Sequence, residues 1–321
     1  KKCKSHFDNF SFFYKELRKE VDIIRISNLL NRESIQVGLD FVDVDTSKDV
    51  KLFVDPLLLP DRFRYIANDF VKTVYRIYGL GNKAGALQLF SHSKECNAIH
   101  FGYSSNKSKG TGVSMQMLDQ FFGYVYKSVD KIKEKLLTPM TMPIFVKKFS
   151  EDRMSDLLVS LLKKELVLYS LEQAKLHGLK ISEEVQHFDY WDVDNHKWAT
   201  FESQYVLAPN ENGVEEILIL VPKSVVSKRF LVNPSRYISV IFQHLQLMEK
   251  YQRTNGTPKS QKELRESEIV ANYQKDKDKS YILDMTLLSP EYYEAYYDNS
   301  IRFSDNKSLN DEELIEILTN K

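Results

Sequence analysis

The chain has 321 residues, of which 42% are hydrophobic, and its 45 Lys and Arg balance its 45 Asp and Glu. This composition provides an ordinary core for one large domain or about two smaller ones. The zero net charge excludes a global attraction to nucleic acid or to anionic membranes, so nucleic-acid binding would need a local basic patch.

Two cysteines, Cys3 and Cys96, are too few for a disulfide scaffold, which favours a reducing compartment. No apolar run approaches the roughly 18 residues of a membrane span, and the N-terminus has no signal-like apolar stretch. We therefore expect a cytoplasmic protein with no membrane partner.

The first hundred residues predict two strands and a long helix. Alternating apolar residues indicate strands at Leu39–Val42 and Leu52–Val54, around a polar turn at Asp45–Lys48. Residues from about 62 to 90 favour a helix with a break near two glycines. The stretch Ala98–Tyr103 is again strand-like and leads into a segment of small and polar residues.

Two long amphipathic helices are predicted in the middle of the chain. Apolar residues recur at helical spacing from Leu118 to Leu136, and prolines follow. A second helix should begin after Ser150, a good N-cap, and end at Gly178, because glycine suits the left-handed position after a helix.

The second half predicts antiparallel strands followed by helices. Strands are expected over 187–207 and 215–223, with a turn at Asn210–Gly213, and a helix opens at Asn233-Pro234. Shorter helices should lie at about 260–275, 290–298 and 310–319. Strands and helices do not alternate, so we predict an α+β fold with a mixed or antiparallel sheet flanked by long helices. We place a core domain at 1–255 and a helical C-terminal region at 256–321.

The segment Ser104–Gly112, SSNKSKGTG, is a candidate substrate-binding loop. A small-residue loop before a helix exposes backbone N–H groups that can hold a phosphate or carboxylate. An ordinary exposed connection is the alternative. The predicted substrate-binding residues are those of this loop together with Arg153 in the next helical motif: Ser104, Ser105, Lys107, Gly110, Gly112 and Arg153.

Acidic residues near this loop suggest a metal-dependent nuclease. Asp55 ends a hydrophobic strand and Glu95 precedes another, so these two could hold Mg²⁺ while a lysine orients the attacking water. The alternative is that these acids have structural roles: Asp55 caps a turn before Pro56, Glu95 is exposed, and Asp152 stabilises the dipole of a helix. The candidate catalytic residues are the acids and the lysine of these motifs: Asp55, Glu95, Lys109, Asp152 and Asp156.

A basic surplus marks the third quarter of the chain. Between Lys223 and Tyr281 there are twelve Lys and Arg against six Asp and Glu. This stretch is either a phosphate-facing surface or a solvated face with scattered lysines.

Four motifs, LFVDP at 52–56, HFGYSSNKSKGTG at 100–112, DRMSD at 152–156 and ILILVPK at 217–223, resemble those of uncharacterised bacterial proteins from phage-defence gene clusters. The resemblance implies a component of an anti-phage system but assigns no catalytic residue. The leading hypothesis is a component that acts on DNA or RNA, with a Mg²⁺-dependent nuclease as its specific activity.

Two alternatives remain open. One is a non-catalytic adaptor or sensor subunit of a defence complex with an ATPase-type partner, docking through the aromatic segment SPEYYEAYYDNSIRF at 289–303. The other is an enzyme that binds a nucleotide or another phosphorylated ligand in the SSNKSKGTG loop.

Overall fold

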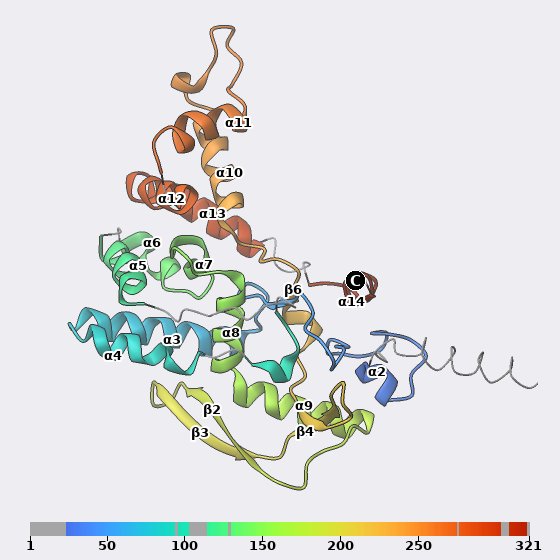
Figure 1. The fold of residues 1–321 in the computed structure, drawn as a ribbon. Coiled ribbons are helices and arrows are strands. Elements are labelled where there is room, and N and C mark those ends of the chain that lie inside the picture. The colour runs from blue at the N-terminus through green and yellow to red at the C-terminus, as the bar shows by residue number, and fades with distance from the viewer. Residues whose placement is uncertain are drawn as a thin grey trace, which may run out of the picture.

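The computed structural model describes residues 24–93, 96–102, 114–127, 130–274, 276–302 and 308–319, apart from the side chains of 127, 130 and 131. The fold is α+β, as the sequence predicts. Figure 1 shows a helical body, a long β-hairpin beneath it, and helices of residues 234–302 rising above it, while the last helix, at 311–319, lies at the side of the body.

The helices of the body lie between residues 26 and 177. In chain order they are α2 (Ile26–Leu29), α3 (Asp61–Gly79), α4 (Lys83–Gln88), α5 (Met115–Lys127), α6 (Asp130–Leu136), α7 (Thr141–Phe145), α8 (Glu151–Leu161) and α9 (Lys163–His177). The break between α3 and α4, the N-cap at Ser150 and the left-handed Gly178 confirm the sequence predictions. The predicted helix from Ser150 is divided at Leu162, whose ψ of 11° departs from helical geometry.

The strands form three antiparallel pairs in the described part of the chain. They are β1 (Phe53–Val54) with β6 (Val226–Ser227), β2 (Gln186–Asp192) with β3 (Lys197–Ser203), and β4 (Val206–Pro209) with β5 (Glu215–Leu218). The β2–β3 hairpin runs beneath α8 and α9 in Figure 1. The antiparallel pairing matches the prediction, but small separate sheets replace one larger sheet.

The predicted strand at Leu39–Val42 is wrong. It forms no hairpin with β1, and instead Phe41 makes a single bridge to Pro222, while Val42 N donates to Val221 O at 3.1 Å. Residues 41–46 are all buried, so their apolar residues contact the core on every side rather than one face of a sheet. Strand β5 ends at Leu218, and residues 219–221 continue as buried, irregular chain.

The predicted strand at Ala98–Tyr103 is also wrong over its described part. Asn97–Ile99 form a 3-10 turn, and His100 has a φ of 54°, in the left-handed region. Only Phe101 pairs in a β manner, through a parallel bridge to Val50. A left-handed residue in the middle of the segment prevents a continuous strand.

The last third contains one helix that the sequence did not predict. Its elements are α10 (Pro234–Leu245), α11 (Gln261–Leu264) with a π-helical turn at Arg265–Val270, α12 (Lys277–Leu288), α13 (Pro290–Arg302) and α14 (Asp311–Thr319). Helix α12 buries three successive residues, Tyr281, Ile282 and Leu283, so its sequence lacks the three-to-four spacing that reveals a helix.

The core is continuous across the predicted boundary at residue 255. Helix α10 packs against α12 and α13, and Tyr237 of α10 stacks on Tyr296 of α13 with ring centroids 4.8 Å apart. Tyr292 and Tyr293 are buried in the same core. The aromatic residues of α13 therefore stabilise the fold from inside. None of the described helices has the length and apolar content needed to cross a bilayer.

Candidate anion-binding site

Three of the predicted motifs meet at the N-terminus of α8. Val54 N of β1 donates to Ser155 Oγ of α8 at 2.9 Å, which places LFVDP beside DRMSD. A Cβ built on Gly102 would lie 3.6 Å from Asp152 Oδ1, so the residue that leads towards the SSNKSKGTG segment lies against the same helix. The sequence motifs are therefore neighbours in space, although about 100 residues separate Val54 from Ser155.

Asp55 is completely buried and has the contacts of a structural residue. Its carboxylate accepts hydrogen bonds from Leu57 N, Leu231 N and Ser227 Oγ, each at 2.9 Å. Burial raises the pKa of Asp55 in spite of these donors, and the nearby Glu151 raises it further. The carboxylate thus joins the end of β1 to the segment that follows β6.

Two predicted acids lie on α8, near a third acid that the sequence did not connect with them. Asp152 is half-buried, and burial raises its pKa; Arg153 lowers it and Asp49 raises it. Burial likewise raises the pKa of Asp49 and lowers that of His100, and these two groups interact. Asp156 lies one turn further along α8 and is partly buried. The site around Asp152 therefore includes Asp49 and His100.

The other predicted site residues lie outside the described residues: Glu95, Ser104, Ser105, Lys107, Lys109, Gly110 and Gly112. Within the described ranges, no group of three or more His, Cys, Asp or Glu is placed to hold a metal ion. The pairing of Asp55 and Glu95 around Mg²⁺ therefore stays a prediction.

A cleft of about 720 Å³ opens beside α8, where three helices begin. Glu151 is the first residue of α8, Asn233–Ser235 begin α10, and Asp276–Lys279 begin α12. The N-terminal end of a helix carries a partial positive charge and attracts anions. The first residues of all three helices line the same cleft.

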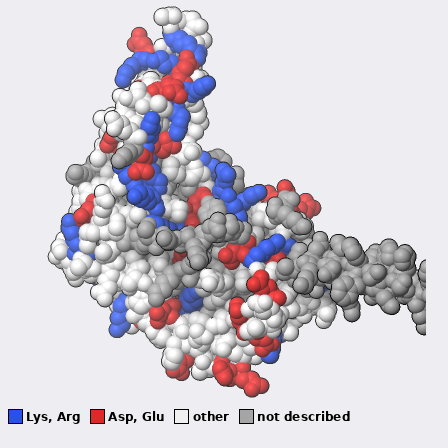
Figure 2. Space-filling model, in the orientation of Figure 1, with Lys and Arg blue, Asp and Glu red and all other residues white. Residues whose placement is uncertain are grey.

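Cationic side chains dominate the walls of the cleft. Its six cations come from five separate parts of the chain: Lys51, Lys148, Arg229, Arg265, Lys277 and Lys279. Figure 2 shows Lys and Arg side chains gathered where the upper helices join the body of the protein.

Two of the three acids of the cleft are engaged with neighbouring groups. Asp278 accepts two hydrogen bonds from Arg265 Nη2, at 2.7 and 2.9 Å, and Glu151 Oε1 accepts from Phe230 N at 2.8 Å. Asp276 is the third acid. With twice as many cations as acids, the cleft carries a local positive charge on a molecule whose net charge is zero.

Lys279 connects α12 to the turn before α8. Its Nζ donates to Val146 O at 2.6 Å and to Phe149 O at 3.0 Å. The turn between these carbonyls contains Lys148, whose φ of 59° is unusual for a residue with a side chain. Burial lowers the pKa of Lys279 to about 8, while Asp276 acts in the opposite direction.

The sequence indicated only part of this cleft. Arg229, Arg265, Lys277 and Lys279 belong to the basic stretch, but other members of that stretch form ion pairs elsewhere, as Arg253 does with Glu263. The sequence around Lys51 does not indicate a role in the cleft, because Lys51 comes close to the start of α8 only in the folded chain.

Comparison with known proteins gives one match. The family model described as "Domain of unknown function (DUF8370)" matches residues 31–233, more than half of the chain. The chain belongs to this family. No curated protein and no solved structure matches it.

The DUF8370 region ends at Asn233, the N-cap residue of α10. It contains α8 and the cleft residues Lys51, Lys148 and Arg229, whereas Arg265, Lys277 and Lys279 lie beyond it. One wall of the cleft therefore comes from the family region and the other from the C-terminal helices.

Proposed function

We propose that the protein binds nucleic acid by its phosphates in the cleft beside α8, as a component of a bacterial anti-phage defence system. The six cations and three helix N-termini around one cavity carry this proposal. Lysine, arginine and helix N-termini are the groups that contact phosphate in protein–nucleic acid complexes. The motif resemblance to proteins of phage-defence gene clusters supports the cellular role.

Charge reversal in the cleft tests the binding step. Lys148 and Arg229 are exposed and lie on the family side of the cleft. Replacing both, Lys148→Glu with Arg229→Glu, should weaken binding of a fluorescent oligonucleotide by roughly tenfold or more, because neither side chain can then pair with a phosphate. Fluorescence anisotropy with single-stranded DNA, duplex DNA and single-stranded RNA measures this effect.

The control is Lys175→Glu, compared with the single variant Arg229→Glu, which changes the net charge by the same amount. Lys175 is exposed on α9, which lies beyond the far end of α8 from the cleft (Figure 1). It changes the net charge in the same direction and should leave affinity nearly unchanged. Equal decreases in affinity at both places would indicate non-specific attraction and would contradict a binding cleft.

We further propose that the same site hydrolyses phosphodiester bonds. The group of Asp49, His100 and Asp152 is close in sequence to two residues of the cleft, because Asp49 is two residues from Lys51 and Asp152 adjoins Glu151. A carboxyl group with a raised pKa next to a histidine suits proton transfer to and from a phosphate ester. Mg²⁺, with Glu95 among its ligands, is the cofactor proposed for this activity.

A cleavage assay separates this activity from the adaptor role. With Mg²⁺ present, the proposal expects cleavage that stops in Asp152→Asn while oligonucleotide binding persists. Binding without cleavage in the wild type would favour the adaptor instead. Such an adaptor would need a docking surface other than Tyr292, Tyr293 and Tyr296, which are buried.

A further inference from the structure

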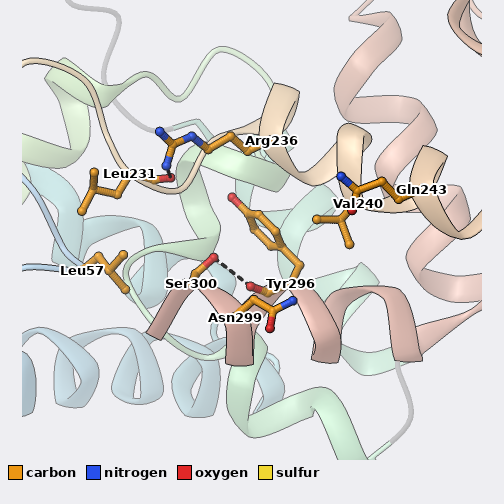
Figure 3. Close-up of a pocket in the computed structure, with 8 residues that line it drawn as sticks. All are labelled: Leu57, Leu231, Arg236, Val240, Gln243, Tyr296, Asn299 and Ser300. Carbon is orange, nitrogen blue, oxygen red and sulfur yellow. Dashed lines mark hydrogen bonds between the residues drawn. The ribbon is translucent and has the colours of Figure 1, made fainter. Parts of the chain in front are cut away.

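A second cavity lies next to the cleft, between α10 and α13. It measures about 360 Å³, within the range of about 300–1,000 Å³ that is common for small-ligand sites. Leu57, Leu231 and Val240 form aliphatic walls, and the ring of Tyr296 lies between them (Figure 3). These walls suit a flat ligand with apolar faces.

The rim of this pocket carries two side-chain amides. Gln243 comes from α10 and Asn299 from α13, and both are exposed. Neither amide forms a hydrogen bond with another described side chain, whereas Ser300 Oγ, also at the rim, donates to Tyr296 O at 2.7 Å. Each amide therefore offers both a donor and an acceptor to a ligand.

The pocket and the cleft share one stretch of chain. Leu231 and Arg236 line the pocket, while Asn233, Pro234 and Ser235 between them line the cleft. Tyr296 joins the two directly, because its hydroxyl accepts a hydrogen bond from Asn233 N at 2.9 Å. A ligand longer than the pocket could therefore reach both cavities around the start of α10.

Hydrogen bonds hold the walls of the pocket in place. Asp55 accepts hydrogen bonds from both Leu57 N and Leu231 N, which sets the distance between two walls of the pocket. Arg236 Nη1 donates to Leu231 O at 2.8 Å, which holds the guanidinium at the edge of the pocket (Figure 3).

We infer that the pocket holds one unstacked base of a single-stranded nucleic acid whose phosphates lie in the cleft. A base has flat apolar faces and an edge of donors and acceptors, which match the aliphatic walls and the two amides. Arg236 would contact the sugar-phosphate between the two cavities. A base paired in a duplex could enter only after unpairing, so the pocket selects single strands. This inference rests on the proposed nucleic-acid binding in the cleft.

The test compares two single-stranded DNA oligonucleotides of equal length, one with normal bases and one with abasic sites at every position. The phosphates are the same, so the cleft binds both alike. The wild type should bind the normal strand roughly tenfold more tightly, because a bound base contributes about 1–3 kcal/mol. The double variant Gln243→Leu with Asn299→Leu should lose most of this preference and keep its affinity for the abasic strand.

The control is Gln88→Leu, which removes an exposed amide from α4 and should change neither affinity. Equal wild-type affinities for the two strands would overturn the base pocket and leave the phosphate cleft standing. An undiminished preference in the double variant would also overturn it. If neither strand binds, the proposed function fails, and the pocket inference fails with it.

Discussion

At the scale of single residues, the buried carboxylate of Asp55 organises the region around the cleft. The sequence singled out this residue because an acid at the end of an apolar strand is unusual. The pattern could not show its partners, since Ser227 and Leu231 are more than 170 residues away. What was predicted as a metal ligand has, in the fold, three hydrogen-bond donors of its own.

Removal of this carboxylate should destabilise the protein. In Asp55→Ala, the backbone N–H groups of Leu57 and Leu231 lose their acceptor, and an unsatisfied buried donor costs about 1–3 kcal/mol. The free energy of unfolding should therefore fall by about 2–4 kcal/mol, measured by urea denaturation. Asp61→Ala, at a fully exposed position on α3, should change it by less than about 0.5 kcal/mol. Equal stabilities of the two variants would contradict the structural role.

Lys279 should make binding depend on pH. Its pKa of about 8 means that the cleft loses most of one positive charge as the pH rises from 7 to about 9. Oligonucleotide affinity should then fall on the order of fivefold, the effect of about 1 kcal/mol for the loss of one positive charge close to a phosphate in water. Lys279→Arg keeps its charge throughout this range and should show a flatter profile.

Unfolding does not explain this decrease in affinity. A lysine whose folded pKa is lowered from 10.5 to about 8 binds fewer protons in the folded state between these values. Its contribution to stability therefore increases as the pH rises through that interval. A profile of Lys279→Arg identical to that of the wild type would show that another group titrates.

At the scale of elements, helix ends were predicted better than strands. Ser150, Asn233 and Gly178 act locally through caps and turns, and the structure confirms each of them. The apolar runs at 39–42 and 98–103 depended on distant partners and were misread as strands. Short buried segments of this kind have no one-sided pattern from which their contacts can be predicted.

The backbone conformation of Gly102 positions the chain beside Asp152. Its φ of 138° is available almost only to glycine, and a Cβ there would have room, at 3.6 Å from Asp152 Oδ1. Gly102→Ala should therefore cost about 1–3 kcal/mol of stability from backbone strain alone. Gly123→Ala, within α5 and with open space around it, should instead stabilise by about 0.5–1 kcal/mol. Thermal unfolding of both variants measures the difference, and a neutral Gly102→Ala would contradict the strain.

At the scale of the whole molecule, the cleft is a product of topology. Its cations come from residues 51, 148, 229, 265, 277 and 279, and α12, which supplies the last two, was not predicted at all. The basic stretch after Lys223 indicated a phosphate-facing surface. The sequence could not show which of its residues line the cleft and which form ion pairs elsewhere. The family region and the C-terminal helices must therefore be present together for the cleft to form.

The most direct test of phosphate binding in this cleft is the dependence of oligonucleotide affinity on salt concentration. For single strands, each neutralised phosphate contributes about −0.7 to the slope of log K against log salt. The wild type should show a slope corresponding to several phosphates, and Arg229→Gln should make it shallower by about 0.7, whereas Lys175→Gln should leave it unchanged. A slope that is the same in the wild type and in Arg229→Gln, or no binding at low salt, would contradict the account.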